Sequence, residues 1–122
     1  MANSLILQLT VNGIINGVPI APVVTQSLIP STNWFVYDTQ SAATSSTAVY
    51  LGSIVAVRKL MIVNLDTTNY VNVAFDNANT TPQKLLPASG TNYDYVVLNP
   101  TTGIWVKANT APCQILVIGF DT

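Results

Sequence analysis

The chain has 122 residues, of which 49% are apolar and only 7% are Asp, Glu, Lys or Arg, with a net charge of −1. A typical soluble domain is about 25% charged, so Thr, Asn and Ser must supply most of the polar surface here. This composition lacks the basic patch that nucleic-acid binding requires, and no apolar run approaches the roughly 18 residues of a membrane helix. Because net charge keeps protein molecules apart, such a neutral surface favours assembly over catalysis.

The residue types that perform chemistry at neutral pH are scarce. The chain has no His, and nucleophile–base catalysis most often uses His as the base, so Ser/His/Asp and Cys/His arrangements are excluded. The one cysteine, Cys113, lies in an apolar run and is interpreted as a small buried hydrophobe. Zinc sites use His and Cys ligands and calcium sites need several carboxylates. We therefore expect no metal, no cofactor and no enzyme.

The acidic residues are all Asp. Four of them stand at expected strand ends or turns, where Asp is favoured for bonding to the local backbone. Asp94 alternates onto the face of Val96 and Leu98, and we expect it at the surface. A glycosidase built on two carboxylates is therefore not favoured.

The first half of the chain alternates apolar and polar residues, which is typical of strands. A first strand is expected over residues 4–12, where Leu5, Leu7, Leu9 and Val11 alternate with Ser4, Ile6, Gln8, Thr10 and Asn12. Asn16-Gly17 is a turn dipeptide tolerant of positive φ. Prolines interrupt the apolar stretch Gly17–Ile29, and a proline cannot donate to a sheet ladder, so we expect an arm or an edge strand there.

The middle of the chain contains one segment of small polar residues, Thr39–Thr47, which predicts a loop. An aromatic strand is expected before it, over residues 34–37. A further strand is expected after it, over residues 49–57, with Gly52 as a site of a bulge or a close approach.

The second half predicts five strands separated by polar turns, over residues 60–65, 70–76, 93–98, 104–108 and 113–120. Strands of this length at short, regular spacing are typical of a β-sandwich or barrel. The prediction is an all-β, jelly-roll-like antiparallel sandwich or barrel of about eight or nine strands, forming a single domain over residues 1–122.

Five aromatic residues are candidates for an interface with other subunits, where Trp and Tyr are enriched: Trp34, Tyr37, Tyr93, Tyr95 and Trp105. The same rings could instead pack in the core. They could also form a platform that stacks on sugar rings, with Asn and Thr as neutral hydrogen-bond partners. The carbohydrate-binding module is therefore an alternative of a different class.

The run from Leu60 to Asp76, the turn Leu85-Leu86-Pro87-Ala88-Ser89-Gly90 and the closing strands of the chain resemble a module of small virion proteins of tailed bacteriophages. The resemblance covers roughly residues 60–121. It implies a β-sandwich subunit of the virion, of the head decoration (cement) type, often a trimer. A neck or tail subunit is the alternative within this class.

The expected function is that of a non-enzymatic capsid decoration protein, a homotrimer that contacts the major capsid protein or other virion proteins. We expect no nucleic acid, membrane or small-molecule substrate as a partner. The first residues show no basic segment and no small-residue cleavage site, so we expect no signal peptide and a protein made in the host cytoplasm and located in the virion.

Overall fold

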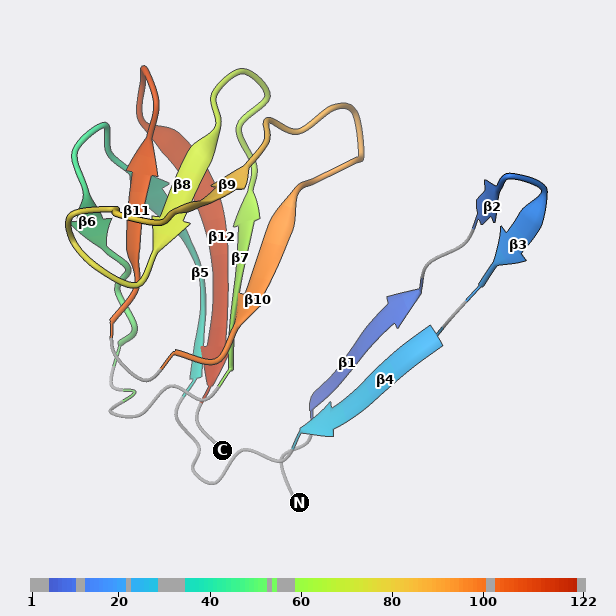
Figure 1. Cartoon of the computed structure of the whole chain (residues 1–122). Coiled ribbons are helices and arrows are strands. Elements are labelled where there is room, and N and C mark those ends of the chain that lie inside the picture. Colours follow the sequence, from blue (N-terminus) through green and yellow to red (C-terminus); the bar gives the residue numbers. More distant parts are fainter. Residues whose placement is uncertain are drawn as a thin grey trace. The chain divides into compact units, whose positions relative to one another are not determined.

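The computed structural model describes residues 5–10, 13–21, 23–28, 35–52, 54, 59–100 and 103–120. Within these ranges the regular structure consists of β-strands, with no helix (Figure 1). The chain divides into two units, Met1–Asn33 with Thr122, and Trp34–Asp121. Each unit has its own sheets, and the sandwich belongs to the second. The single domain expected over residues 1–122 stays a prediction.

The first unit contains a long antiparallel hairpin. Thr10 lies opposite Val23 and Gly13 opposite Ile20, so the same register holds on both sides of residues 11–12 and 21–22. The expected Asn16-Gly17 turn joins the two halves, with φ values of 51° and 80°, and positive φ at both positions is what a two-residue hairpin turn requires. The hairpin's strands are β1 (Leu5–Thr10), β2 (Gly13–Ile15), β3 (Val18–Ile20) and β4 (Val23–Leu28). The expected segment Gly17–Ile29 thus contributes β3 and β4, and its role as an arm stays a prediction.

The second unit contains two four-stranded antiparallel sheets, in the orders β10-β7-β12-β5 and β6-β11-β8-β9 (Figure 1). The strands of the first sheet are β10 (Tyr95–Leu98), β7 (Lys59–Asn64), β12 (Cys113–Phe120) and β5 (Phe35–Ala42). Those of the second sheet are β6 (Thr47–Ala48), β11 (Trp105–Ala108), β8 (Val71–Ala74) and β9 (Gln83–Leu85).

The strand pairs of this unit are nested. The first strand pairs with the last, β5 with β12, and the pairing continues inward through β6–β11 and β7–β10 to β8–β9. Among the strands described, only the β8–β9 connection stays within one sheet. This is the strand order of a jelly roll, in which two Greek keys form a double sheet. The all-β, jelly-roll-like sandwich expected from the sequence is confirmed, and it does not close into a barrel.

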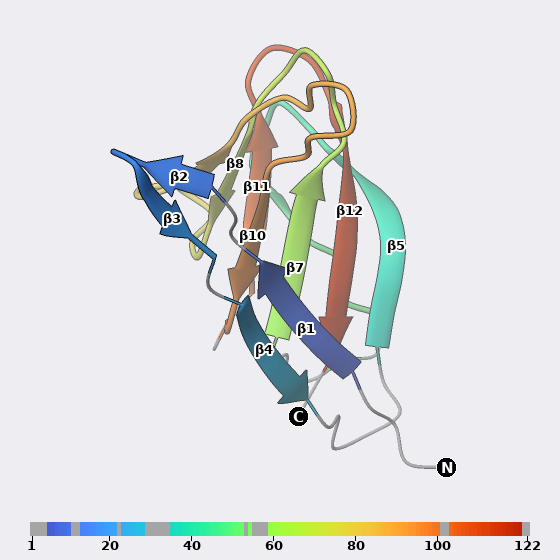
Figure 2. The ribbon, with the colours of Figure 1, turned by 90° about the vertical axis from the view of Figure 1, so that its right-hand side faces the viewer.

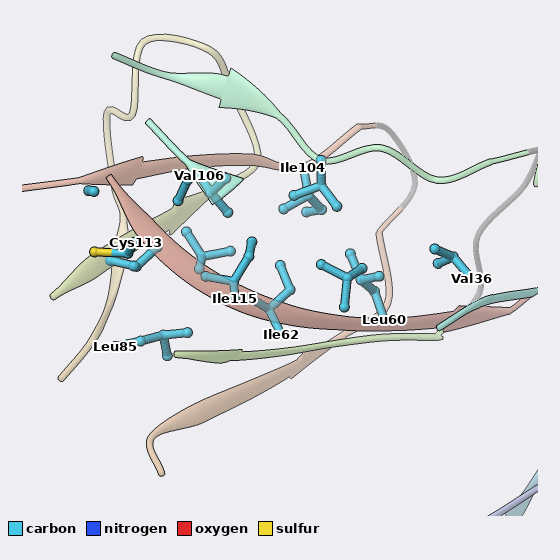
Figure 3. Packing of buried hydrophobic residues seen from close by; sticks show 14 of the residues in the cluster. Val36, Leu60, Ile62, Leu85, Ile104, Val106, Cys113 and Ile115 are labelled. Atoms are coloured by element: carbon cyan, nitrogen blue, oxygen red, sulfur yellow. The ribbon is translucent and has the colours of Figure 1, made fainter. Parts of the chain in front are cut away.

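The core lies between the two sheets, where alternate residues of facing strands interdigitate (Figure 3). Gly119 of β12 leaves no room for a larger residue, because a Cβ there would lie 2.9 Å from Leu60 Cδ1 and 3.1 Å from Val36 Cγ1 on the two neighbouring strands of its sheet. Fully burying a large aliphatic side chain stabilises a fold by about 1.5–3 kcal/mol. The largest fully buried aliphatic side chains are Leu60, Ile62, Leu85, Ile104 and Ile115, followed by Val71, Val106 and Val117.

The loop expected over Thr39–Thr47 is shorter than predicted. Strand β5 continues to Ala42, because Ser41 and Ala42 pair with Gln114 and Cys113 of β12, and Thr47 already begins β6. The loop itself covers residues 43–46. Small polar residues disfavour a strand only weakly when a long neighbouring strand, here β12, offers backbone hydrogen-bond partners.

The prediction of a strand over residues 49–57 is wrong where it can be compared with the structure. Residues 49–52 and 54 are described, and they lie in no strand. Val49 and Ile54 are buried as core residues. The backbone between them, at Tyr50, is hydrogen-bonded to a side chain instead of a neighbouring strand. The Gln40 amide donates to the Tyr50 carbonyl at 2.7 Å and accepts from the Tyr50 N–H at 3.0 Å. Gly52 has φ +61° and open space around the position of a Cβ, so it is a turn glycine rather than a bulge or a close approach. Residues 55–57 lie outside the described residues.

The buried Asn64 amide joins the two sheets at one end of the sandwich. Its Nδ2 donates to the carbonyls of Asn69, Leu85 and Leu86, at 2.9, 3.2 and 3.0 Å. Because an amide nitrogen has only two hydrogens, one hydrogen is shared between two carbonyls. Asn64 Oδ1 accepts from the Asp66 N–H at 3.0 Å. The end of β7, in one sheet, is thereby held against the end of β9, in the other.

Asp66 organises the turn that follows. Its Oδ1 accepts from the Asn69 N–H at 2.6 Å and the Thr68 N–H at 2.8 Å, and its carbonyl accepts from the Ala88 N–H at 2.7 Å. The hydrogen bonds from Asn69 and then Thr68 lower the pKa of the Asp66 carboxyl below its ordinary value of 3.8, because they favour the ionised form. The expected polar turn at residues 66–69 is confirmed, and it leads from one sheet to the other.

Replacing Asn64 with Asp should destabilise the protein more than replacing it with Ala. Asn64→Ala leaves buried carbonyls without a donor and should cost about 2 kcal/mol. Asn64→Asp instead places a carboxylate against those carbonyls and should cost at least about 3 kcal/mol. Urea unfolding followed by Trp fluorescence measures both, with Asn72→Asp, on the outer surface of the second sheet, as the control. Equal losses for the two Asn64 variants would contradict the assigned hydrogen bonds.

The lowered pKa of Asp66 predicts a component of stability that depends on pH. A carboxyl whose pKa is lower in the folded state stabilises the fold fully above its unfolded value and loses that contribution as pH falls below it. The stabilisation should therefore be complete above about pH 5 and be lost between about pH 4 and pH 2. In Asp66→Asn this component should be absent, so the stability difference between wild type and variant should shrink as pH falls through this range. A difference independent of pH, measured by urea unfolding at each pH, would refute the assignment.

Candidate interaction surface

Strands β7, β12 and β5 of the sheet β10-β7-β12-β5 lie side by side in Figure 2, and apolar residues occupy much of the outer surface of this sheet. Residues that alternate with the buried core positions point outward, and the strand register aligns them in rows. One row contains Tyr95, Val63 and Leu116, and the next contains Val97, Met61, Ile118 and Tyr37. Phe120 and Phe35 follow at the end of the sheet, beside Lys59. We call these nine apolar residues the apolar sheet face: Phe35, Tyr37, Met61, Val63, Tyr95, Val97, Leu116, Ile118 and Phe120. Three of them, Phe35, Tyr37 and Tyr95, are exposed, four are partly buried, and Val63 and Phe120 are buried.

The apolar sheet face is large enough to be an interface. Four strands about 4.8 Å apart, each about 20 Å long as β7 is, cover about 400 Å², which is in the size range of patches that mark interaction sites. Its edges are open, since Phe35 and Tyr37 on β5 are 72% and 67% exposed. Sheets with one solvated surface usually have polar residues on it.

The opposite sheet differs. Its outer surface carries Lys107, Asn72 and Lys84 side by side across β11, β8 and β9, and Lys84 Nζ lies 4.1 Å from the centre of the Tyr70 ring. Such a surface is well solvated, because charged heads stay in water while their stems cover apolar groups. The sandwich is therefore asymmetric, with one polar sheet surface and one apolar sheet surface.

The structure brings together only part of the predicted aromatic set. Tyr37 and Tyr95 lie at opposite edges of the apolar sheet face, and Tyr93 is exposed just before β10. Trp105 lies on the outer surface of the other sheet and packs its ring against Gly103, where a Cβ would lie 3.3 Å from Trp105 Cη2. Trp34 lies outside the described residues. Whether these residues form an interface stays a prediction.

Sequence reasoning missed the aliphatic residues between the two tyrosines. Leu116 and Ile118 of β12 and Met61 of β7 occupy the middle of the face. A signal for them was present, since residues 115–120 contain no polar side chain. A strand without polar alternation is typical of a sheet covered on both sides.

Reactive groups are few in the described part of the structure. Cys113 is fully buried, and its thiol donates to the Ala111 carbonyl at 3.5 Å. Burial, and then the negative charge of Asp66, raise the pKa of this thiol above its ordinary value of 9.0, so it is protonated at neutral pH. The expected buried hydrophobe is confirmed. In the same ranges no three Cys or acidic side chains gather closely enough to hold a metal ion, and no helix is long and apolar enough to span a bilayer.

The Cys113 thiol should resist labelling in the native protein, because the reactive species is the exposed thiolate. A disulfide reagent at neutral pH should label less than about one tenth of native chains in the time that labels urea-unfolded chains completely. Labelling is followed by absorbance and by mass. Equal rates for native and unfolded protein would show that the thiol is accessible.

The search for similar proteins gives no guide to this surface. No protein-family model, no curated protein and no solved structure matches the chain. A fold in any case hosts many functions, and function must be argued from a site. What the molecule does is therefore inferred from the chemistry of its own surfaces.

Proposed function

We propose that the chain is a non-enzymatic structural subunit of a bacteriophage virion, a capsid decoration protein that assembles as a trimer and stabilises the head. The apolar sheet face is the observation that carries the assembly part of this proposal. The virion and its trimeric state come from the resemblance of residues 60–121 to such proteins.

The jelly-roll fold is compatible with a role in the virion, but it is equally compatible with other functions. This architecture recurs in viral capsid domains and in lectins, so the fold leaves both the virion subunit and the carbohydrate-binding module open. The two classes differ in the surface that they need. A subunit interface has an apolar centre with aromatic and Met residues, whereas a sugar platform needs neighbouring exposed rings with polar partners.

The apolar sheet face matches the first description. Its two tyrosines are three strand spacings apart, which is about 14 Å, and Val, Met, Leu and Ile fill the strands between them. One sugar ring cannot span that distance. The described residues at the middle of this face offer aliphatic contacts rather than hydrogen-bond partners, which favours a protein partner over a glycan.

The lack of charge supports contacts between identical chains. A surface with little charge does little to repel another copy of the same chain. Of the four Lys and Arg residues, two, Lys84 and Lys107, lie on the opposite sheet surface. Of those that the structure describes, Lys59 stands at the border of the apolar sheet face.

The wild-type protein should form trimers in solution, and Tyr37→Lys should weaken them. Tyr37 is 67% exposed, so the substitution leaves the core intact but puts a charge into the contact, which is unfavourable without a partner. Light scattering after size-exclusion chromatography over a range of concentrations measures the assembly. The variant should dissociate at concentrations at least about tenfold higher than those at which wild type dissociates, which corresponds to a loss of about 1.4 kcal/mol in the free energy of association. Because apolar burial drives the assembly, added salt should not dissociate it.

The matched control is Asn72→Lys, which adds the same charge to the opposite sheet surface. It should assemble like wild type. A wild type that stays monomeric at all concentrations, or a control that fails as completely as Tyr37→Lys, would contradict the role given to the apolar sheet face. A glycan titration that changes Trp fluorescence of a monomer would favour the carbohydrate-binding alternative instead.

A further inference from the structure

The hairpin of the first unit, residues 5–28, contains no charged side chain. All nine charged residues of the chain lie at position 38 or beyond. Charged side chains and lysines in particular are the usual means of keeping sheet edges from pairing with other chains. The hairpin has none of this protection.

Large apolar side chains are exposed on both surfaces of the hairpin. By register, Ile6, Ile14 and Val23 belong to one surface, and Val18, paired with Ile15, belongs to the other. Their exposed fractions are 67%, 73%, 57% and 58%. An isolated two-stranded hairpin is at best marginally stable in water. This hairpin is therefore suited to lie against another apolar surface.

We propose that the hairpin is an arm that seats on the apolar sheet face of a second copy of the chain. This inference rests on the proposed function and names the contact by which copies assemble. Each chain supplies one uncharged arm and one apolar sheet face, so the two surfaces match in number as well as in chemistry. Among the described residues, the charge at the border of this contact is Lys59.

The dimensions set the size of such a contact. The hairpin is about 10 Å wide, which fits within the width of the four-stranded face, but it is about 35 Å long and extends beyond the strands of that face, which are about 20 Å long. One arm therefore overlaps about 200 Å² of the face, a quarter of the about 800 Å² per partner in a standard interface. Each copy makes the contact twice, once with its arm and once with its face, which gives about half of that value.

The geometry of the contact also determines the assembly that it builds. An arm on a face joins two different surfaces, and such heterologous contacts build a ring when the rotation between copies closes and an open filament when it does not. A ring of three copies is the trimer of the proposed function. A face packed on a face would instead be a self-complementary contact and would stop at a dimer.

Two full-length variants test the inference. The arm variant carries Ile6→Lys, Ile14→Lys and Val18→Lys, which puts charge on both surfaces of the hairpin. The face variant carries Tyr37→Lys and Met61→Lys, in one row of the sheet. A control with Asn72→Lys and Ala48→Lys adds two charges to the outer surface of the opposite sheet. Circular dichroism and thermal unfolding establish that each variant is folded before its assembly is measured.

Each variant alone should need at least about a hundredfold higher concentration than wild type to assemble, because the contact then buries unpaired ammonium groups. Mixed together, they should form a one-to-one heterodimer and no trimer. The face variant contributes its intact arm, the arm variant contributes its intact face, and no further copy can be added at either end. Light scattering of the mixture, and the anisotropy of a labelled arm variant titrated with the face variant, measure this directly.

Several results would overturn the arm contact. If wild type assembles but the mixture gives no heterodimer, the copies associate through some other pair of surfaces, and the proposed function stands without this inference. An arm variant that assembles like wild type leads to the same conclusion. A wild type that stays monomeric over the whole concentration range overturns both, since its hairpin then has no second copy to bind. If the two-charge control fails as the variants do, added charge alone explains their loss.

Discussion

The jelly roll depends on one buried amide. Asn64 holds the end of β7, in one sheet, against the carbonyls that end β9, in the other, and the same side chain supports the turn built on Asp66. Apolar packing between sheets is not directional and would tolerate a shift of one sheet over the other. Hydrogen bonds to three fixed carbonyls do not. These bonds fix the two sheets relative to each other at this corner, while the rows on the apolar sheet face are aligned by the backbone ladders within their own sheet.

Much of the jelly roll could be predicted from the sequence, because most of its strands carry their own signal. The apolar run of residues 113–120 predicted β12 with its observed bounds, and the polar turn at residues 66–69 separated β7 from β8. The prediction failed for segments whose structure is determined by contacts with another part of the fold. Gln83-Lys84-Leu85 has no alternation of its own and becomes β9 by pairing with β8, while Val49 and Ile54 fill the core from a segment outside any strand.

The candidate surface was harder to predict than the fold. Aromatic residues were chosen for their type, and the structure separates them onto two sheets. The residues between Tyr37 and Tyr95 were assigned to strands, but their membership in one continuous surface depends on strand order. The pairing of β12 with both β5 and β7 joins strands far apart in the chain, and local periodicity contains no information about which strands become neighbours.

The nested pairing of the jelly roll also bears on how the chain reaches its native state. The β8–β9 ladder closes a short loop, and each pair outward encloses all those inside it, until β5 and β12 join the two ends of the unit. Closing a longer loop costs more chain entropy, and folds rich in distant contacts form slowly. The outermost ladder encloses the longest segment of chain, and it contributes Tyr37 and Ile118 to the apolar sheet face. The row that contains these two residues is therefore completed by the ladder whose closure costs the most chain entropy.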